Sequence, residues 1–244
     1  MASILDRYGI KEVADVTFYK IGTDGSVGAP VLYLDTLKVS TIEQTAENTS
    51  ARGGKGNPEL ITWDYGKEIT VTLEDALFSA KSMAIMFGSV DADGDAVMGS
   101  DATILKTVRK ADVIDGKVTI NGETVTIPTD GVSYYDANGS AGTSTSYEYA
   151  TFPLTVKDIS VINISAETFP GTYYVTGDTY ARRETDGLDE FFQFIIPKAK
   201  VQSEVTLTME AEGDPSTFSM NLRVLRPASG SMMKLVKYNL GANG

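Results

Sequence analysis

Three aspartates at alternate positions, Asp91, Asp93 and Asp95, are the residues whose spacing most suggests chemistry. Alternating carboxylates can place their oxygens around a hard cation, as the first half of an EF-hand calcium loop does. Such a loop also requires glycine at its sixth position and a bidentate glutamate at its twelfth, and these positions are Ala96 and Ala102 here. The calcium pattern is therefore incomplete, and a solvated turn is the competing interpretation.

A glycine-rich segment, Arg52-Gly53-Gly54-Lys55-Gly56, offers backbone N–H groups that could form a nest for an anion. A phosphate loop joins a strand to a helix and ends in Gly-Lys followed by Ser or Thr. This segment lacks both features, so we favour a flexible arm over a nucleotide site.

Carboxylates are numerous enough for a carbohydrate-active enzyme, which needs only two of them. Asp64, Glu74, Asp178 and Glu190 are examples, but none stands in a pattern distinct from a solvated strand face. Aromatic side chains could stack on sugars, yet alternating aromatic residues in strands more often belong to a core or an interface. The aromatic cluster comprises Tyr173, Tyr174, Tyr180, Phe191, Phe192 and Phe194.

The composition excludes much familiar enzymology, because the 244 residues include no cysteine and no histidine. Disulfides, thiolate nucleophiles, thiolate zinc sites and the side chain best suited to proton transfer near neutral pH are therefore absent. The net charge of −12 argues against a surface that grips nucleic acid, since such surfaces are basic.

The N-terminal residues lack the charged start and apolar core of a secretory signal, and no run of about 18 apolar residues could span a membrane. We therefore expect a soluble protein that is made in a cytoplasm. A chain of 244 residues can form one large β domain, and we take a single domain as the expectation.

Strand patterns dominate the sequence, because β-branched and aromatic residues alternate with polar ones between Gly, Asn, Asp and Pro. The clearest hairpin is Lys117 to Ile127, whose Asn121-Gly122 suits the two positive φ angles of a type I′ turn. The other expected strands are 13–21, 31–39, 59–63, 67–73, 147–156, 159–164 and 173–181.

Two polar stretches predict long loops. Residues 41–58 show no apolar periodicity, and residues 129–147 are rich in Gly, Ser, Thr and Asp. Loops beyond about 12 to 15 residues in a compact domain are usually functional or disordered. The predicted loop at 41–58 is long enough to fall in this class.

One helix is predicted. Thr72 and Asp75 have the spacing of a capping box, and Gly88 stands where a left-handed C-terminal cap is expected. Apolar residues recur between them at helical spacing, at Leu73, Leu77, Ala80, Ala84 and Phe87. We expect this helix to cover one face of a sheet.

The last third has the strongest two-residue period. Val205, Leu207, Met209 and Ala211 alternate with polar residues, as do Phe218, Met220, Leu222 and Val224, and residues 212–215 form the turn between them. Such a hairpin has one core face and one polar face, and the polar face can meet water, a pore or a neighbouring subunit.

Two segments resemble the tail tube proteins of bacteriophages. The first runs from Arg52 to Ser79 and combines the glycine-rich segment, two strands and the helix. The second begins as FFQFIIPKAK at residues 191–200 and continues through the alternating hairpin, which ends near Arg226. The segment at about 89–188 has no counterpart in this resemblance.

The resemblance implies an all-β fold, mainly an antiparallel β sandwich or barrel, with one flanking α-helix. It also implies a single tail-tube-like domain over residues 1–244, with a probable insertion at about 89–188. In that family, strands continue between subunits to close hexameric rings, and the rings stack into a hollow tube. Loops and arms lock adjacent rings, so residues 41–58 would be an arm and Arg52, Gly53, Gly54, Lys55 and Gly56 the inter-ring assembly loop.

The implied function is that of a structural virion protein rather than an enzyme, without a cofactor or metal. Its partners would be further copies of itself and other tail proteins, such as sheath, initiator or terminator. DNA would pass through the lumen during ejection without specific binding, because a neutral or acidic wall does not hold phosphates as Lys and Arg do. The protein would assemble in the host cytoplasm and reside in the virion tail.

Two other functions remain open from the sequence. A capsid decoration or baseplate component would have a similar composition, and a carbohydrate-active enzyme based on two carboxylates is the less favoured alternative.

Overall fold

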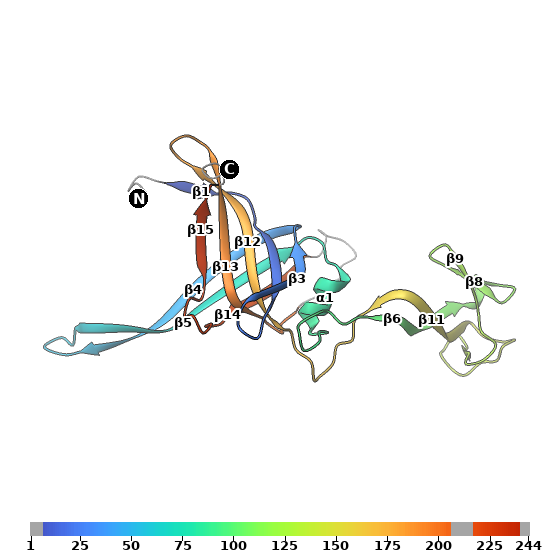
Figure 1. Ribbon diagram of the computed structural model, residues 1–244. Helices are drawn as coiled ribbons and strands as arrows, with labels where there is room; N and C mark the ends of the chain where they lie inside the picture. The colour runs from blue at the N-terminus through green and yellow to red at the C-terminus, as the bar shows by residue number, and fades with distance from the viewer. Residues whose placement is uncertain (1–6, 206–216, 240–244) are drawn as a thin grey trace. The chain divides into compact units, whose positions relative to one another are not determined.

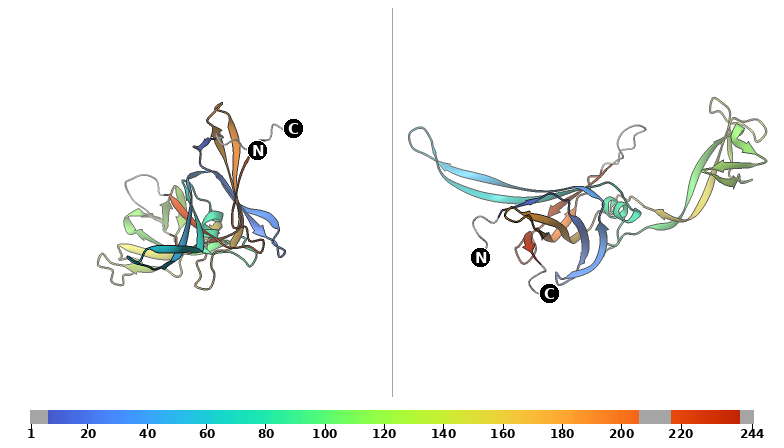
Figure 2. Two further views of the ribbon diagram at one scale, coloured as in Figure 1. Left: turned by 90° about the vertical axis from the view of Figure 1, so that its left-hand side faces the viewer. Right: turned by 90° about the horizontal axis from the view of Figure 1, so that it is seen from above.

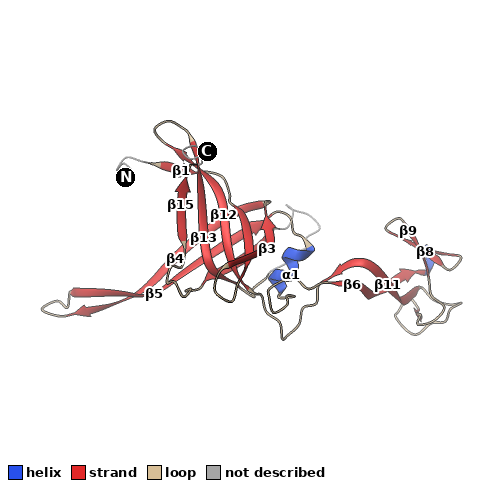
Figure 3. Cartoon of the chain, viewed as in Figure 1, coloured by secondary structure: helices blue, strands red, loops and turns tan. Residues whose placement is uncertain are grey.

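The computed structural model describes residues 7–205 and 217–239 (Figure 1). The chain divides into two compact units, one formed by the residues up to Met98 and from Ile162 onward, the other by Gly99–Val161. Antiparallel strands make up most of both units, and the described residues include one α-helix (Figure 3). The predicted fold class, all-β with one helix, is confirmed.

The first unit is built on one nine-stranded antiparallel sheet. Its strands follow the order β3-β2-β12-β13-β14-β5-β4, with β1 paired to β12 and β15 paired to β13. The elements are β1 (Tyr8–Ile10), β2 (Asp15–Ile21), β3 (Val27–Leu34), β4 (Leu37–Arg52), β5 (Glu59–Asp75), α1 (Ala80–Phe87), β12 (Thr172–Arg183), β13 (Asp189–Val201), β14 (Phe218–Val224) and β15 (Lys234–Tyr238).

Alternating side chains of this sheet form one core. In β14 the buried positions are Phe218, Met220, Leu222 and Val224, as the two-residue period predicts. Buried residues of β3 and of β5, near the two ends of the strand order, belong to the same apolar cluster. The sheet therefore curves around its own core, as Figure 1 shows.

The predicted loop at 41–58 is wrong over most of its length. Residues 41–52 belong to the 16-residue strand β4, which pairs with the 17-residue strand β5, and only residues 53–58 turn between them. The two short strands expected at 59–63 and 67–73 are one continuous strand (Figure 2). Sequence periodicity fails here because nearly all of β4 is exposed on both faces, so no apolar side is needed.

The helix is shorter than predicted. Helix α1 begins after Ser79, whose side chain accepts a hydrogen bond from the Ser82 N–H at 3.0 Å while Ser82 bonds back to the Ser79 N–H. The predicted capping box of Thr72 and Asp75 is wrong, because both residues lie in β5 and Leu73 between them fills the sheet core. The left-handed cap at Gly88 is confirmed, with φ of 78°.

The second unit contains two small antiparallel sheets, ordered β10-β11-β6 and β7-β8-β9. Their cluster of buried residues is small and consists of Val108, Val118, Ala150 and Phe152. The elements are β6 (Gly99–Arg109), the 3-10 helix η1 (Lys110–Asp112), β7 (Val113–Ile114), β8 (Lys117–Ile120), β9 (Glu123–Thr126), β10 (Ser133–Tyr135) and β11 (Tyr149–Val161). The unit begins and ends on paired strands, since Gly99 lies opposite Val161.

Local predictions in this unit had mixed outcomes. The hairpin at Asn121-Gly122 is confirmed, with φ of 50° and 89° at these residues. The predicted loop at 129–147 contains the short strand β10, and the two strands expected at 147–156 and 159–164 are largely one strand, β11. The strand β6 was not predicted.

Part of the predicted C-terminal hairpin lies outside the described residues. This concerns residues 206–216, which hold most of its first strand and its turn. The expectation of one domain with an insertion at about 89–188 stays a prediction, although Thr172–Arg183 pairs within the first unit's sheet.

Candidate functional site

The three alternating aspartates form a turn. The Asp91 carboxylate accepts backbone hydrogen bonds from Asp93 at 3.0 Å and from Asp95 at 2.9 Å, while Asp95 makes an ion pair with Lys20 at 2.6 Å. The Asp91 carboxylate thus stabilises the turn, and the Asp95 carboxylate connects the turn to Lys20 of β2. Over residues 7–205 and 217–239, no group of three His, Cys, Asp or Glu side chains is arranged to hold a metal ion.

The carboxylates considered for a glycosidase lie on three strands, with Asp64 and Glu74 in β5, Asp178 in β12 and Glu190 in β13. The Asp178 carboxylate accepts a hydrogen bond from Gln193 at 2.8 Å, and Asp64 lies in the outer part of β5. Glu190 is buried between Arg183 and Lys237, with 2.8 Å between its Oε2 and the Lys237 Nζ. Hydrogen bonds from Lys237 and then Arg183 hold the pKa of Glu190 below its usual value, so this carboxylate stays ionised in a structural ion cluster.

The aromatic cluster divides between the core and the surface. Tyr173 and Phe194 are buried, and burial raises the pKa of Tyr173 to about 12. The Tyr173 hydroxyl donates to the Gly94 carbonyl at 2.9 Å, which ties the aspartate turn to the sheet. Tyr180 and Phe191 contact each other on the sheet surface, with ring centroids 5.4 Å apart.

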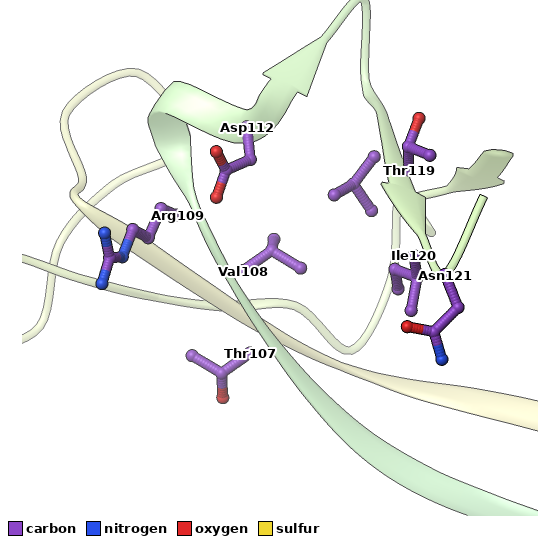
Figure 4. Close-up of a pocket in the computed structure, with 8 residues that line it drawn as sticks. Thr107, Val108, Arg109, Asp112, Thr119, Ile120 and Asn121 are labelled. Carbon is purple, nitrogen blue, oxygen red and sulfur yellow. The ribbon is translucent and has the colours of Figure 1, made fainter. Parts of the chain in front are cut away.

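A cavity of about 550 Å³ in the second unit lies between β6 and β8 (Figure 4). Arg109 and Asp112 occupy one side of it in Figure 4, and Ile120 and Asn121 the other. Among the described residues, its lining supplies a single carboxylate and no histidine or cysteine. It therefore lacks the paired acid and base that hydrolysis of a glycosidic bond requires.

The glycine-rich segment lies at the tip of the β4–β5 hairpin. Arg52 ends β4 and makes an ion pair with Glu59 at 3.1 Å. The turn beyond it is closed by a hydrogen bond from the Gly53 N–H to the Pro58 carbonyl at 3.2 Å. Gly54 and Gly56 have φ of 84° and 86°, so the segment forms a turn that requires glycine at both positions.

The flank of this hairpin carries a feature that the sequence analysis missed. Ile61, Trp63 and Tyr65 alternate along β5 and are 54%, 52% and 53% exposed. Trp63 is the one tryptophan of the chain, and a buried position is its usual place. The alternation is visible in the sequence, but dividing the segment into strands at 59–63 and 67–73 places Tyr65 outside both strands and hides the run of three.

A search of the described residues finds no helix long and apolar enough to cross a membrane.

An all-β subunit whose carboxylates serve turns and ion pairs, and whose longest hairpin exposes aromatic side chains, has the features of a structural protein that assembles. The chain belongs to the YomU/Tube protein family, whose family model matches residues 8–237. This membership identifies it as a tube-type structural protein of phages and confirms the predicted resemblance. No curated protein matches the chain.

Proposed function

We propose that the protein assembles into hexameric rings that stack into the inner tail tube of a phage, a conduit for DNA during ejection. The observation that carries this proposal is the outer part of the β4–β5 hairpin, which has no core of its own and exposes four large apolar side chains, Leu60, Ile61, Trp63 and Tyr65. A two-stranded ribbon is marginally stable alone in water, so a neighbouring subunit is the natural support.

The tip of the same hairpin suits a contact between rings. Arg52, Gly54, Lys55 and Gly56 are exposed there, and the turn closes on its own hydrogen bonds. We assign Arg52–Gly56 to the inter-ring contact. The exposed cations Arg52 and Lys55 would meet acidic surface on the next ring, of which a chain with net charge −12 has much.

The charge also fits a passage for DNA. With a net charge of −12, a ring of identical subunits repels phosphate groups overall. A wall that does not release counterions from DNA does not retain it, so DNA slides through. From the family membership we further propose a structural protein without enzymatic activity, located in the virion tail, assembled in the host cytoplasm and joined there by other tail proteins such as sheath, initiator or terminator.

The second compact unit, Gly99–Val161, is proposed to be an insertion in the tube domain. Its first and last residues face each other in a strand pair, so its removal leaves two chain ends that a tight turn can join.

The test removes the outer hairpin. Residues 48–64 are replaced by Asn-Gly, which joins the paired residues Glu47 and Tyr65 with a type I′ turn. We expect a folded protein by circular dichroism that forms neither rings nor tubes in negative-stain electron microscopy. The wild-type chain, concentrated in parallel, should form both.

The control removes a different segment, one whose flanking residues are also paired in a strand ladder. Residues 100–160 are replaced by Asn-Gly between Gly99 and Val161, and rings and tubes are expected to remain. Tubes from the hairpin variant would refute the role of the hairpin. A wild-type chain that stops at a small oligomer would support a capsid decoration or baseplate component instead.

A further inference from the structure

One face of the outer half of the β4–β5 hairpin carries a row of large apolar side chains, while Leu60 is exposed outside this row, where the register shifts between Ala51 and Arg52. Ile61, Trp63 and Tyr65 lie on one face of β5, because alternate residues of a strand share a face. We call these three residues the apolar stripe. Their ladder partners on β4 are Ala51, Thr49 and Glu47, while Asn48 pairs with Asp64 on the opposite face.

A bulge keeps the stripe away from the chain's own core. In the inner half, Ser40 and Ile42 of β4 pair with the buried Leu73 and Val71, so even-numbered residues of β4 face the core. The register shifts at Gly66, whose φ is 63°, and beyond this point the stripe pairs with odd-numbered residues of β4. The stripe therefore continues the face that points away from the core.

A groove elsewhere in the first unit has matching chemistry. It has a volume of about 330 Å³ and lies where the chain before β2 passes β4 and β13. Its apolar lining is largely exposed, with Ile10 at 51% and Ile42 at 40%. We call it the edge groove, and its apolar lining includes Ile10, Val13, Val39, Ile42 and Phe192.

The edge groove also holds an unused hydrogen-bonding group. The Ser40 hydroxyl oxygen lines it, is buried, and has no hydrogen-bond partner among residues 7–205 and 217–239. A buried hydroxyl without a partner is costly, and an incoming donor would relieve that cost. The indole of Trp63 is a donor with a large apolar body, which is what an apolar groove with one free acceptor accommodates.

Charges on the two surfaces are complementary. Lys11 and Lys38 line the edge groove with Glu12 as the one acidic residue of its lining. Glu47 stands beside the stripe, opposite Tyr65. Within the described part of the chain, neither lysine nor Glu47 makes an ion pair, so each is available to a partner.

We infer that the apolar stripe of one copy packs into the edge groove of a second copy of this chain, with Trp63 reaching Ser40 and Glu47 reaching Lys11 or Lys38. The inference rests on the proposed function, because it names the surface that receives the hairpin within the assembly. The two surfaces differ, so the contact is heterologous and repeats from copy to copy until it closes a ring or extends a filament.

Disulfide trapping tests the contact, since the chain contains no cysteine of its own. The double variant Thr49→Cys, Ile42→Cys places one thiol on the stripe's face and one in the groove. Seven residues of extended strand separate them by about 23 Å. A disulfide needs Cα atoms within about 7 Å, so every bond formed must join two copies.

Oxidation of the assembled double variant should give a ladder of bands at multiples of the 26.2 kDa chain on a non-reducing gel. The matched control is Asn48→Cys with Ile42→Cys. Asn48 adjoins Thr49 and is equally exposed, but it faces the opposite side of the hairpin, so no ladder is expected. Thr49→Cys with Val39→Cys repeats the test from a second groove position and should also give the ladder.

Electron microscopy of the same samples before oxidation separates the possible failures. Rings or tubes without a ladder, or with equal ladders from the control, overturn the docking inference and leave the proposed function standing. A ladder without rings or tubes supports the docking and overturns the tube. Monomers without a ladder overturn both.

Discussion

The inner half of the β4–β5 hairpin pairs with β14 and fills a core, whereas the outer half extends as two strands alone. Both halves belong to the same pair of antiparallel strands. In the inner half Ile69, Val71 and Leu73 are buried, while in the outer half Ile61 and Trp63 are about half exposed. Burial of side chains in the inner half of β5 thus stabilises the fold, while the outer half leaves apolar side chains exposed to solvent.

The difference between the halves arises at one residue. The bulge at Gly66 moves the apolar side chains of β5 from the core face to the opposite face. Without it, the stripe would continue the core's own surface. A single strand can therefore carry buried apolar side chains in one half and exposed ones in the other.

The largest expected effect is the difference between truncating one apolar side chain in the inner half and one in the outer half of the hairpin. Leu73→Ala removes a buried side chain and is expected to lower the unfolding free energy by about 2 to 5 kcal/mol. Trp63→Ala removes an exposed one and should change it by less than about 0.5 kcal/mol while abolishing assembly. Denaturant unfolding and electron microscopy measure the two effects, and a large stability loss for Trp63→Ala would show that the outer half packs within its own subunit.

Substitution at the bulge should have an intermediate effect. Gly66→Ala places a side chain at φ of 63°, which costs about 1 to 2 kcal/mol for a non-glycine residue. A Cβ there meets the Glu47 side chain only at 3.8 Å, an ordinary contact, so the strain comes from the backbone. Thermal unfolding of Gly66→Ala beside Gly25→Ala, whose φ is 81° with open space around it, tests this. If Gly66→Ala and its control variant lose equal stability but only Gly66→Ala fails to assemble, the bulge is needed to place the stripe.

The smallest expected effect is a difference in acid sensitivity between the sheet, which contains Glu190, and the outer hairpin. The folded pKa of Glu190 is depressed below 4.5 by Lys237 and Arg183, so its ion cluster stabilises the fold above that pH. The contribution is lost as pH falls through the folded pKa. Melting temperatures between pH 7 and pH 3 should therefore fall less steeply for Glu190→Gln than for wild type.

The control for this effect is Asp64→Asn in the outer hairpin. Asp64 makes no ion pair within the described residues, so its variant should follow the wild-type pH dependence. An equal flattening for both variants would mean that the acid response does not come from the Glu190 cluster.

Sequence patterns predicted those elements in which local chemistry and burial agree. Asn121-Gly122 needs only its own backbone to form a turn, and β14 alternates because one of its faces lies in the core. The Gly88 cap follows from local chemistry in the same way, because its φ of 78° at the end of α1 favours glycine. In each case the residue type follows directly from what surrounds it.

The predictions were wrong where the burial of a residue does not follow from the local sequence pattern. Strand β4 reads as a loop because its exposed outer half needs no apolar face, and its partner is supplied by β5 alone. Leu73 matches a helical period only because helical and strand spacings coincide over short runs. For the candidate site, the sequence predicted an assembly loop at Arg52–Gly56, and its role stays a prediction. The stripe and the edge groove depend on strand register and tertiary contacts, which one sequence does not display.

The pairing of Gly99 with Val161 has a consequence for the history of the gene. A segment whose two ends are neighbours in one ladder can be gained or lost as a single block of coding sequence. Such an exchange leaves the register of every strand in the rest of the chain unchanged.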